Sequence, residues 1–239
     1  MYYSIVIAQI LFVRWLVMIY IAFDIDGTLY DCSTIVGDAF AQGIDEFLKD
    51  HTELDIKNPS TQEIVNMVGT PVNEIFYTLF PRLPYNLVQQ LNDICTNKLS
   101  SMVLQKKGII LPGVIETIPM LYNNGYTLLT ASNGRKKYVQ AILDAYELSH
   151  YFFNIVALED KRLHNKTQLL TYYKNSLYDC KQLIMVGDRT NDMVAAQNNG
   201  LPFIACAFGH NAHEVEHCRW IAHSFYEIPQ IVERIIENC

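Results

Sequence analysis

The sequence predicts an α/β fold, a doubly wound parallel sheet with an all-helical domain inserted after its first strand. Two observations support this prediction. From Gly108 to the end of the chain, segments with helical periodicity alternate with short apolar runs typical of buried parallel strands. Between residues 33 and 111, apolar residues recur only at helical spacing. We therefore assign residues 18–32 and 112–239 to the α/β core and residues 33–111 to a helical insert.

The first core strand is predicted at Ile19–Phe23, an apolar run followed directly by Asp24, Asp26 and Gly27. Residues two apart on an extended chain point the same way, so both carboxylates would project from the C-terminal tip of the strand. Two such acids repel each other unless a cation or a shared proton lies between them. The pair therefore suits a divalent metal, with one carboxylate as nucleophile and the other as acid and base. The structural alternative is an Asx-rich turn that ends the strand.

Four helices are predicted in the insert. The first has an amphipathic face that begins at Val36. A capping box formed by Ser60 and Glu63 predicts the start of the second helix, and Thr70-Pro71 predicts the start of the third. The fourth and longest helix carries the apolar residues Leu87, Leu91, Ile94, Cys95 and Met102.

Polar residues also follow two later strands of the predicted core. The run Thr127–Ala131 leads into Ser132 and Asn133, and the run Gln182–Val186 leads through a glycine into Asp188. In a doubly wound sheet, active residues gather at the C-terminal ends of the strands. We therefore expect these side chains to lie at the same edge as the aspartate pair.

A lysine is expected to complete this group. Lys166 opens a helix over residues 166–176, and its apolar periodicity favours it over Lys161, which lies in a charged loop. Asp192 lies one helical turn after Asp188. Two readings stay open for Asp192: it helps to hold metal-bound waters, or it caps the following helix.

In this order, these segments resemble the haloacid dehalogenase-like hydrolase superfamily, in particular its phosphatases of the phosphoglycolate phosphatase type, over about residues 18–239. The resemblance implies a Rossmann-like core and a helical cap that closes over the site; a cap that is only a second packed layer is the alternative. It implies that Asp24 is the nucleophile that forms an aspartyl-phosphate. It also implies that Asp26 protonates the leaving oxygen and then activates water.

The same resemblance implies the residues that bind phosphate and metal. The phosphate-binding residues are Ser132, Asn133 and Lys166. The ligands of a Mg²⁺ ion are Asp24, Asp188 and the main-chain carbonyl of Asp26. These residue types suit the chemistry, because Mg²⁺ prefers carboxylates and waters, and because a lysine and a hydroxyl can stabilise the charge on the transferring phosphoryl group.

We therefore expect a magnesium-dependent phosphatase that hydrolyses a small phosphoglycolate-, nucleotide- or sugar-phosphate-like metabolite. Dehalogenases and phosphonatases of this fold lack an acid at the position of Asp26, whereas sugar phosphomutases keep both aspartates. A sugar phosphomutase on the same scaffold is therefore one alternative. A non-catalytic phosphate-binding or regulatory protein is the other, although a binding module has no need of both aspartates.

Composition is typical of a cytoplasmic enzyme, either a monomer or a homodimer. Half of the 239 residues are apolar, which is enough for a sizeable core. The net charge of -7 argues against a nucleic-acid partner, because a phosphate backbone would be repelled. The six cysteines include no CxxC pair and are expected to be reduced thiols.

Residues 1–17 form a strongly apolar N-terminal extension of uncertain status. They fall short of the ~20 residues that a transmembrane helix needs, and they include Arg14. Three readings stay open: a product of an upstream start codon, a packed segment, or a membrane anchor. We expect no stable membrane association.

Overall fold

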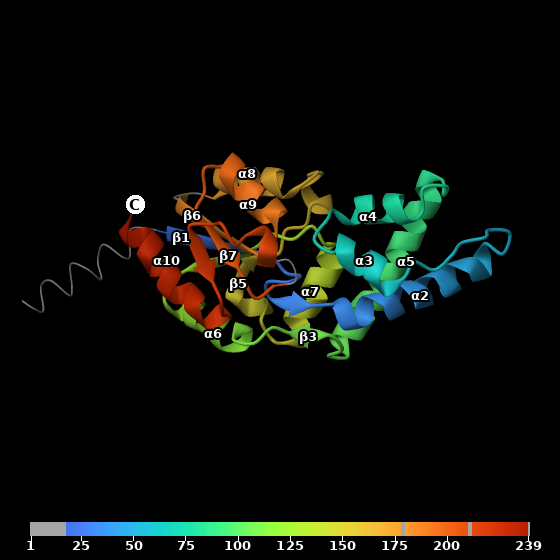
Figure 1. Ribbon diagram of the computed structural model, residues 1–239, viewed down its shortest axis with the longest axis horizontal. Helices are drawn as coiled ribbons and strands as arrows, with labels where there is room; N and C mark the ends of the chain where they lie inside the picture. The colour runs from blue at the N-terminus through green and yellow to red at the C-terminus, as the bar shows by residue number, and fades with distance from the viewer. Residues whose placement is uncertain (1–17, 178–179, 210–211, 239) are drawn as a thin grey trace, which may run out of the picture.

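The computed structural model describes residues 18–177, 180–209 and 212–238 (Figure 1). The apolar extension over residues 1–17 lies outside the described residues, as do the three readings that its sequence left open. Within the described part of the chain, no helix is long and apolar enough to cross a membrane.

The described residues form one six-stranded sheet in the order β5-β4-β1-β6-β7-β8, and each neighbouring pair is parallel. In chain order the strands are β1 (Met18–Phe23), β4 (Thr127–Thr130), β5 (Phe152–Asn154), β6 (Cys180–Gly187), β7 (Phe203–Cys206) and β8 (Trp220–Ala222). The predicted α/β class with a parallel sheet is confirmed. The first strand of the chain is central, between β4 and β6, so both of its edges are paired.

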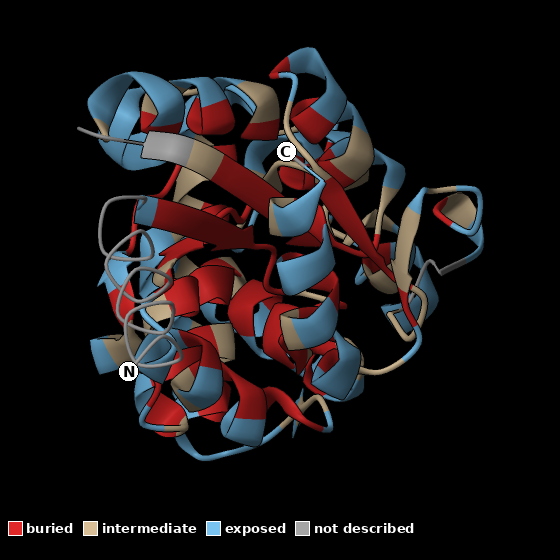
Figure 2. Ribbon diagram, turned by 90° about the vertical axis from the view of Figure 1, so that its left-hand side faces the viewer, coloured by how far each residue is buried: buried red, intermediate tan, exposed pale blue. Residues whose placement is uncertain are grey.

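Helices cover both faces of the sheet, because the side chains of β1 alternate between two apolar layers. Ile21 and Phe23 pack on one face and Tyr20 and Ala22 on the other. The first layer includes residues of α6 (Val114–Asn123), α7 (Lys136–Ala145) and α10 (Ile228–Glu237). The second includes residues of α8 (Lys166–Ser176) and α9 (Thr190–Asn198). Figure 1 shows α8 and α9 above the sheet and α6 below it, and Figure 2 shows the strands buried along most of their length.

Short 3₁₀ turns join several of these elements. They are η1 (Ser149–Tyr151), η2 (Glu159–Lys161), η3 (Ala212–Glu214) and η4 (Phe225–Glu227).

Four helices make up most of residues 33–111, and they form a group beside the sheet at the right of Figure 1. They are α2 (Ser33–Asp50), α3 (Thr61–Met67), α4 (Val72–Leu79) and α5 (Tyr85–Leu104). The capping box at the start of α3 is confirmed, with Ser60 and Glu63 bonded to each other's main chain. Helices α2 and α5 pack closely at Gly43, where a Cβ would lie 2.5 Å from the sulfur of Cys95. We call α2–α5 the cap; its division from the core at residues 33 and 111 remains a prediction.

One expectation for this segment was wrong. Ile109–Ile110 form a strand, β3, that pairs antiparallel with β2 (Tyr30–Asp31), although no strand was expected between residues 33 and 111. A two-residue strand is too short to show a period of two in the sequence, and only its partner, about 80 residues away, defines it. The pair lies where the chain leaves and re-enters the core, so it ties the two crossings together.

Candidate active site

The candidate site lies where three neighbouring strands end at the same level. Phe23 of β1 pairs with Thr130 of β4 and with Val186 of β6. The ladder continues one step further, because Asp24 N donates to the Val186 carbonyl at 2.9 Å and Ala131 N donates to the Phe23 carbonyl at 2.7 Å. The residues that follow these strands therefore meet at one edge of the sheet, as the sequence predicted.

A buried cluster of charges occupies this edge. Lys166 Nζ donates to Asp24 Oδ1 at 2.7 Å and also contacts Asp192 Oδ1. All three side chains are at most 3% exposed. Burying such charges is costly unless they are paired, so the lysine and the two carboxylates stabilise one another.

Burial and pairing shift the pKa values of this cluster in opposite directions. Burial raises the pKa of Asp24 above its usual value, and the Lys166 ammonium opposes that shift. Burial raises the pKa of Asp192 to about 6, again against the effect of Lys166. Burial alone would lower the pKa of Lys166, but the carboxylates of Asp192 and Asp24 outweigh it and raise the pKa overall. The lysine is therefore charged at neutral pH.

Three carboxylates gather closely enough to hold one metal ion. One oxygen each from Asp24, Asp188 and Asp192 lies within 4.8 Å of the others, and all three residues are buried. Asp24 Oδ2 is buried and has no hydrogen-bond partner among the described residues. An all-oxygen, strongly anionic donor set is the kind that Mg²⁺ or a similar hard cation prefers, so these residues fit the expected metal.

Two glycines make room for the carboxylate of Asp188. A Cβ on Gly27 would lie 2.2 Å from Asp188 Oδ2, and one on Gly209 would lie 2.3 Å from Asp188 Cβ. Gly27 also has φ +82°, in the left-handed region that favours glycine. The glycine after the aspartate pair is therefore needed both for the turn and for the close approach of Asp188.

The Asp26 carboxylate contacts the core helix α7. Tyr138, near the start of α7, donates its hydroxyl to Asp26 Oδ1 at 2.6 Å. Burial, together with the nearby Asp26 carboxylate, raises the pKa of Tyr138 well above its usual value, so the phenol stays protonated and donates. The expected main-chain contact of Asp26 with the metal remains a prediction. No local pattern in the sequence marks Tyr138, because its position is typical of the apolar face of an amphipathic helix.

Of the two readings left open for Asp192, the structure shows the helix cap, and a role in holding metal-bound waters remains a prediction. Its Oδ2 accepts from the main-chain N–H of Arg189 at 3.1 Å and so caps the start of α9, while its Oδ1 contacts Lys166. Lys161, the rejected alternative to Lys166, is exposed, and its ammonium lies 5.2 Å from the ring centre of Tyr172. Among the two candidate lysines, Lys166 is therefore the one that reaches Asp24.

The loop after β4 contributes Ser132 and Asn133, both nearly fully buried. Gly134 N donates to Ser132 Oγ at 2.9 Å, which fixes the hydroxyl at the pocket wall. The Asn133 amide group donates to the Gly69 carbonyl of the cap at 2.7 Å. The side chain of Asn133 thus joins core to cap, and its expected phosphate contact remains a prediction.

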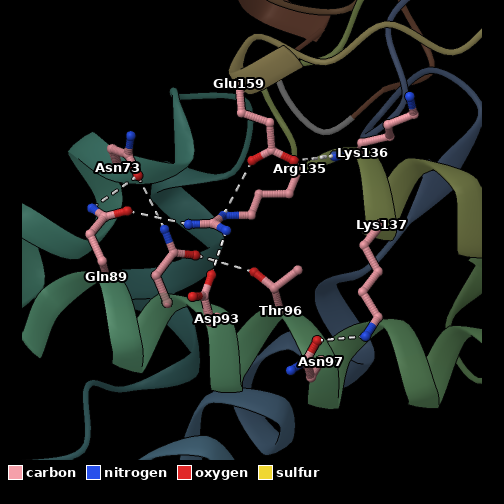
Figure 3. Close-up of polar contacts among 10 residues, drawn as sticks. Asn73, Gln89, Asp93, Thr96, Asn97, Arg135, Lys136, Lys137 and Glu159 are labelled. Carbon is pink, nitrogen blue, oxygen red and sulfur yellow. Dashed lines mark hydrogen bonds and ion pairs between the residues drawn. The ribbon is translucent and has the colours of Figure 1, made fainter. Parts of the chain in front are cut away.

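Two arginines that the sequence did not single out also join core and cap. The Arg189 guanidinium donates to the Val68 carbonyl and to Glu214 Oε1, the latter at 3.3 Å. Arg135, just before α7, lies 2.5 Å from Asp93 and donates to Gln89 at 3.4 Å, both on the cap helix α5 (Figure 3). Such pairings depend on residues that are distant in the chain, so no local sequence pattern predicts them.

A pocket lies between the strand ends and the cap. The space free of protein atoms there, including space open to solvent, is about 670 Å³. Its core wall is polar and contains Asp24, Asp26 and the loop 132–135, whereas its cap wall is built from α2, α3, α4 and α5. Asp24, Asp26 and the hydroxyl of Ser132 thus line one space that a phosphate ester could enter, and Asp24 also belongs to the buried cluster with Lys166.

A family model described as haloacid dehalogenase-like hydrolase matches residues 21–206. The phosphoglycolate phosphatase of Vibrio vulnificus (strain YJ016) is 25% identical over 196 residues, which cover 80% of this chain and 84% of that protein. The phosphoglycolate phosphatase of Pasteurella multocida is 25% identical over 205 residues, covering 80% and 86%.

Solved structures show the same fold. A predicted phosphatase of Clostridium acetobutylicum superposes with a TM-score of 0.71 at 22% identity and covers 92% of this chain and 99% of its own. The β-phosphoglucomutase of Clostridium difficile superposes with a TM-score of 0.67 at 14% identity, with the same coverage. At these identities the likeness concerns the fold alone.

Proposed function

This chain belongs to the haloacid dehalogenase-like hydrolase family and is a phosphatase; from that premise we propose that it hydrolyses a small phosphorylated metabolite, with Mg²⁺, through an aspartyl-phosphate on Asp24. The observation that supports the proposal most directly is the hydrogen bonding of the two Asp24 carboxylate oxygens at the pocket wall. Lys166 holds Oδ1 at 2.7 Å, while Oδ2 is buried without a hydrogen-bond partner among the described residues. A buried carboxylate oxygen without a partner is costly, and a role as metal ligand or nucleophile accounts for it.

In the first step, Asp24 attacks phosphorus, and the bond from phosphorus to the ester oxygen breaks. The electron pair leaves with that oxygen, and Asp26, which lines the same pocket, donates a proton to it. Lys166 balances the negative charge that gathers around Asp24, and the Ser132 hydroxyl binds an oxygen of the transferring group.

In the second step, water attacks the phosphorus of the aspartyl-phosphate, and the bond from phosphorus to the Asp24 oxygen breaks. Asp26 now takes the proton from the water, so the same group serves as acid and then as base. Tyr138 holds the Asp26 carboxylate through its hydroxyl at 2.6 Å and thereby fixes the position of that group. Inorganic phosphate and a free Asp24 carboxylate result.

Asp24 and Asp188 are the residues proposed to hold Mg²⁺, with the main-chain carbonyl of Asp26, and Asp192 lies beside them. When bound, the ion would neutralise phosphoryl oxygens and keep Asp24 ionised against the effect of burial. The lysine alone supplies one positive charge for a site that must contain three carboxylates and a phosphate dianion.

The test is release of inorganic phosphate from a panel of small phosphate esters, with Mg²⁺ and with excess chelator. We expect release only with the metal, and loss of release by at least about a thousandfold in the Asp24→Asn variant, whose amide is not a nucleophile. Circular dichroism should show that this variant is folded. No release from any ester would contradict the proposal.

The same panel separates the phosphomutase alternative, which the retained aspartate pair leaves open. A mutase would convert a sugar phosphate into its isomer in the presence of a sugar bisphosphate, and ³¹P NMR would detect the isomer in place of free phosphate.

A further inference from the structure

The pocket above the strand ends has two chemically different halves. The half at the core contains Asp24, Asp26 and the loop after β4, which serve the phosphoryl group. The half at the cap is lined chiefly by apolar side chains from α2 to α5, including Val36, Phe40, Ile64, Ile75, Phe76 and Leu99. The alcohol part of a phosphate ester, which points away from the nucleophile, would lie against this apolar half.

Charge on the pocket wall is the second observation. Among the described residues that line the pocket, Arg135 is the single lysine or arginine. Its guanidinium is already balanced by two carboxylates, because Nη1 lies 2.5 Å from Asp93 and Nε lies 3.6 Å from Glu159 (Figure 3). It also donates to Gln89 at 3.4 Å. The charge of Arg135 is therefore balanced by contacts that join the cap to the core, and its Nε is the one buried atom of the guanidinium without a hydrogen-bond partner among the described residues.

Polar groups on the cap wall are few. Thr70 and Thr96 supply the hydroxyls there, and Thr96 already donates to Asn92 at 3.2 Å. A ligand rich in hydroxyls would lose hydrogen bonds to water without replacing them. A ligand carboxylate would lose its hydration against the apolar cap wall, where the described lining residues include no lysine or arginine other than the ion-paired Arg135.

We infer that the site takes phosphate monoesters whose alcohol part is uncharged and largely apolar, and that it discriminates against esters that carry a carboxylate, such as phosphoglycolate. The inference rests on the proposed phosphatase function and narrows its substrate class. It also separates this chain from the relatives named phosphoglycolate phosphatase, which are 25% identical to it over the 196 and 205 residues that align.

The test measures kcat/KM of the full chain with Mg²⁺ on two matched pairs of esters. The pairs are ethyl phosphate with phosphoglycolate, and hexyl phosphate with its analogue that carries a terminal carboxylate. We expect each uncharged ester to exceed its carboxylated partner by about a hundredfold or more, which equals about 2.8 kcal/mol. From ethyl to hexyl phosphate, kcat/KM should rise about fourfold per methylene group, the equivalent of about 0.8 kcal/mol.

A pair of variants on one helix tests the apolar wall directly. Leu99→Lys places a cation on the pocket wall of α5, whereas Leu104→Lys places one at the exposed end of the same helix, outside the pocket. Leu99→Lys should lower kcat/KM for hexyl phosphate at least tenfold and narrow the preference over the carboxylated analogue. Leu104→Lys should leave both values unchanged.

Calorimetry separates failure of this inference from failure of the proposed function. Hexylphosphonate and its carboxylated analogue bind without turnover, and the uncharged compound should bind at least thirtyfold more tightly to the wild-type protein. Equal or tighter binding of the carboxylated compound, or equal kcat/KM within each ester pair, would overturn the inference even if phosphate is released. Absence of phosphate release, with the binding preference intact, would overturn the phosphatase proposal and leave the ligand class standing.

Discussion

Replacing Lys166 by methionine tests the electrostatic reasoning most directly, because it removes one charge and keeps the length of the side chain. In the wild-type protein the ammonium lies between the buried carboxylates of Asp24 and Asp192. Removing one partner of a buried ion pair costs about 3–5 kcal/mol, because the remaining charge is left without compensation. At pH 8 and without metal, we expect the unfolding free energy to fall by about 3 kcal/mol. This is the lower end of that range, because one of the two carboxyl groups can take up a proton and so lose its uncompensated charge.

The dependence on pH has a definite sign. The pKa of Asp192 is about 6 in the folded protein and 3.8 in the unfolded chain, so the folded state binds the proton more tightly. The corresponding stability is fully present below pH 3.8 and is lost as the pH rises through 6. In Lys166→Met the lysine no longer opposes burial, and the folded pKa rises further. The deficit against wild type should therefore shrink at pH 5.5 and grow toward pH 8.

Urea unfolding of both proteins at pH 5.5 and pH 8, in excess chelator, measures this difference. Lys161→Met is the matched control, because it removes an exposed lysine of the same region and should change stability by no more than about 0.5 kcal/mol. A loss below about 1 kcal/mol at pH 8, or a deficit that grows on acidification, would refute the argument.

Three further predictions concern the groups around the cluster. Tyr138→Phe removes a hydrogen bond to the Asp26 carboxylate that is worth about 1.5–3 kcal/mol. It should lower kcat about tenfold or more, most strongly for poor leaving groups. An equal loss of kcat for all leaving groups, with chemistry rate-limiting, would exclude this positioning role. Asp188→Ala should raise the Mg²⁺ concentration for half-maximal activity by about tenfold or more, and an unchanged metal titration would remove Asp188 from the site. Gly27→Ala should cost about 1–3 kcal/mol of stability, measured by urea unfolding, and weaken metal activation. The new methyl group would clash with the Asp188 carboxylate, and the φ of +82° would be strained for alanine. Wild-type behaviour in both assays would contradict the need for glycine there.

The parts of the fold that the sequence predicted are those with strong local signals. The strand before Asp24 has a continuous apolar run, and the capping box at Ser60 and Glu63 satisfies main-chain groups within one helical turn. The position of Lys166 at the start of α8 also follows from local periodicity, and the structure adds a cap that the sequence analysis did not name, in which Asn165 accepts from Gln168 N. Such features need no knowledge of distant residues.

The features that the sequence did not predict all depend on contacts between distant segments. β3 is a strand only because Ile109–Ile110 meet Tyr30–Asp31. Tyr138 reaches Asp26 across 112 positions of the chain, and Arg135 meets Asp93 across 42. A tyrosine or an arginine in an amphipathic helix has no local mark that distinguishes a site residue from a packing residue.

This difference explains why the reaction class can be inferred from the sequence of this chain more readily than the substrate. The proposed reacting groups follow strand ends, and the parallel register brings any residue at those positions to one edge. A short motif such as Asp24 to Gly27 therefore predicts the chemistry. The cap wall is assembled from side chains of four helices, and each of its apolar residues is also a normal core residue by periodicity. Only the packed structure separates the face of Phe40 and Ile75 that lines the pocket from the faces that stabilise the cap. Substrate selection can therefore change by substitution of cap residues such as Leu99 while the aspartate pair, the lysine and the acidic cluster remain as they are.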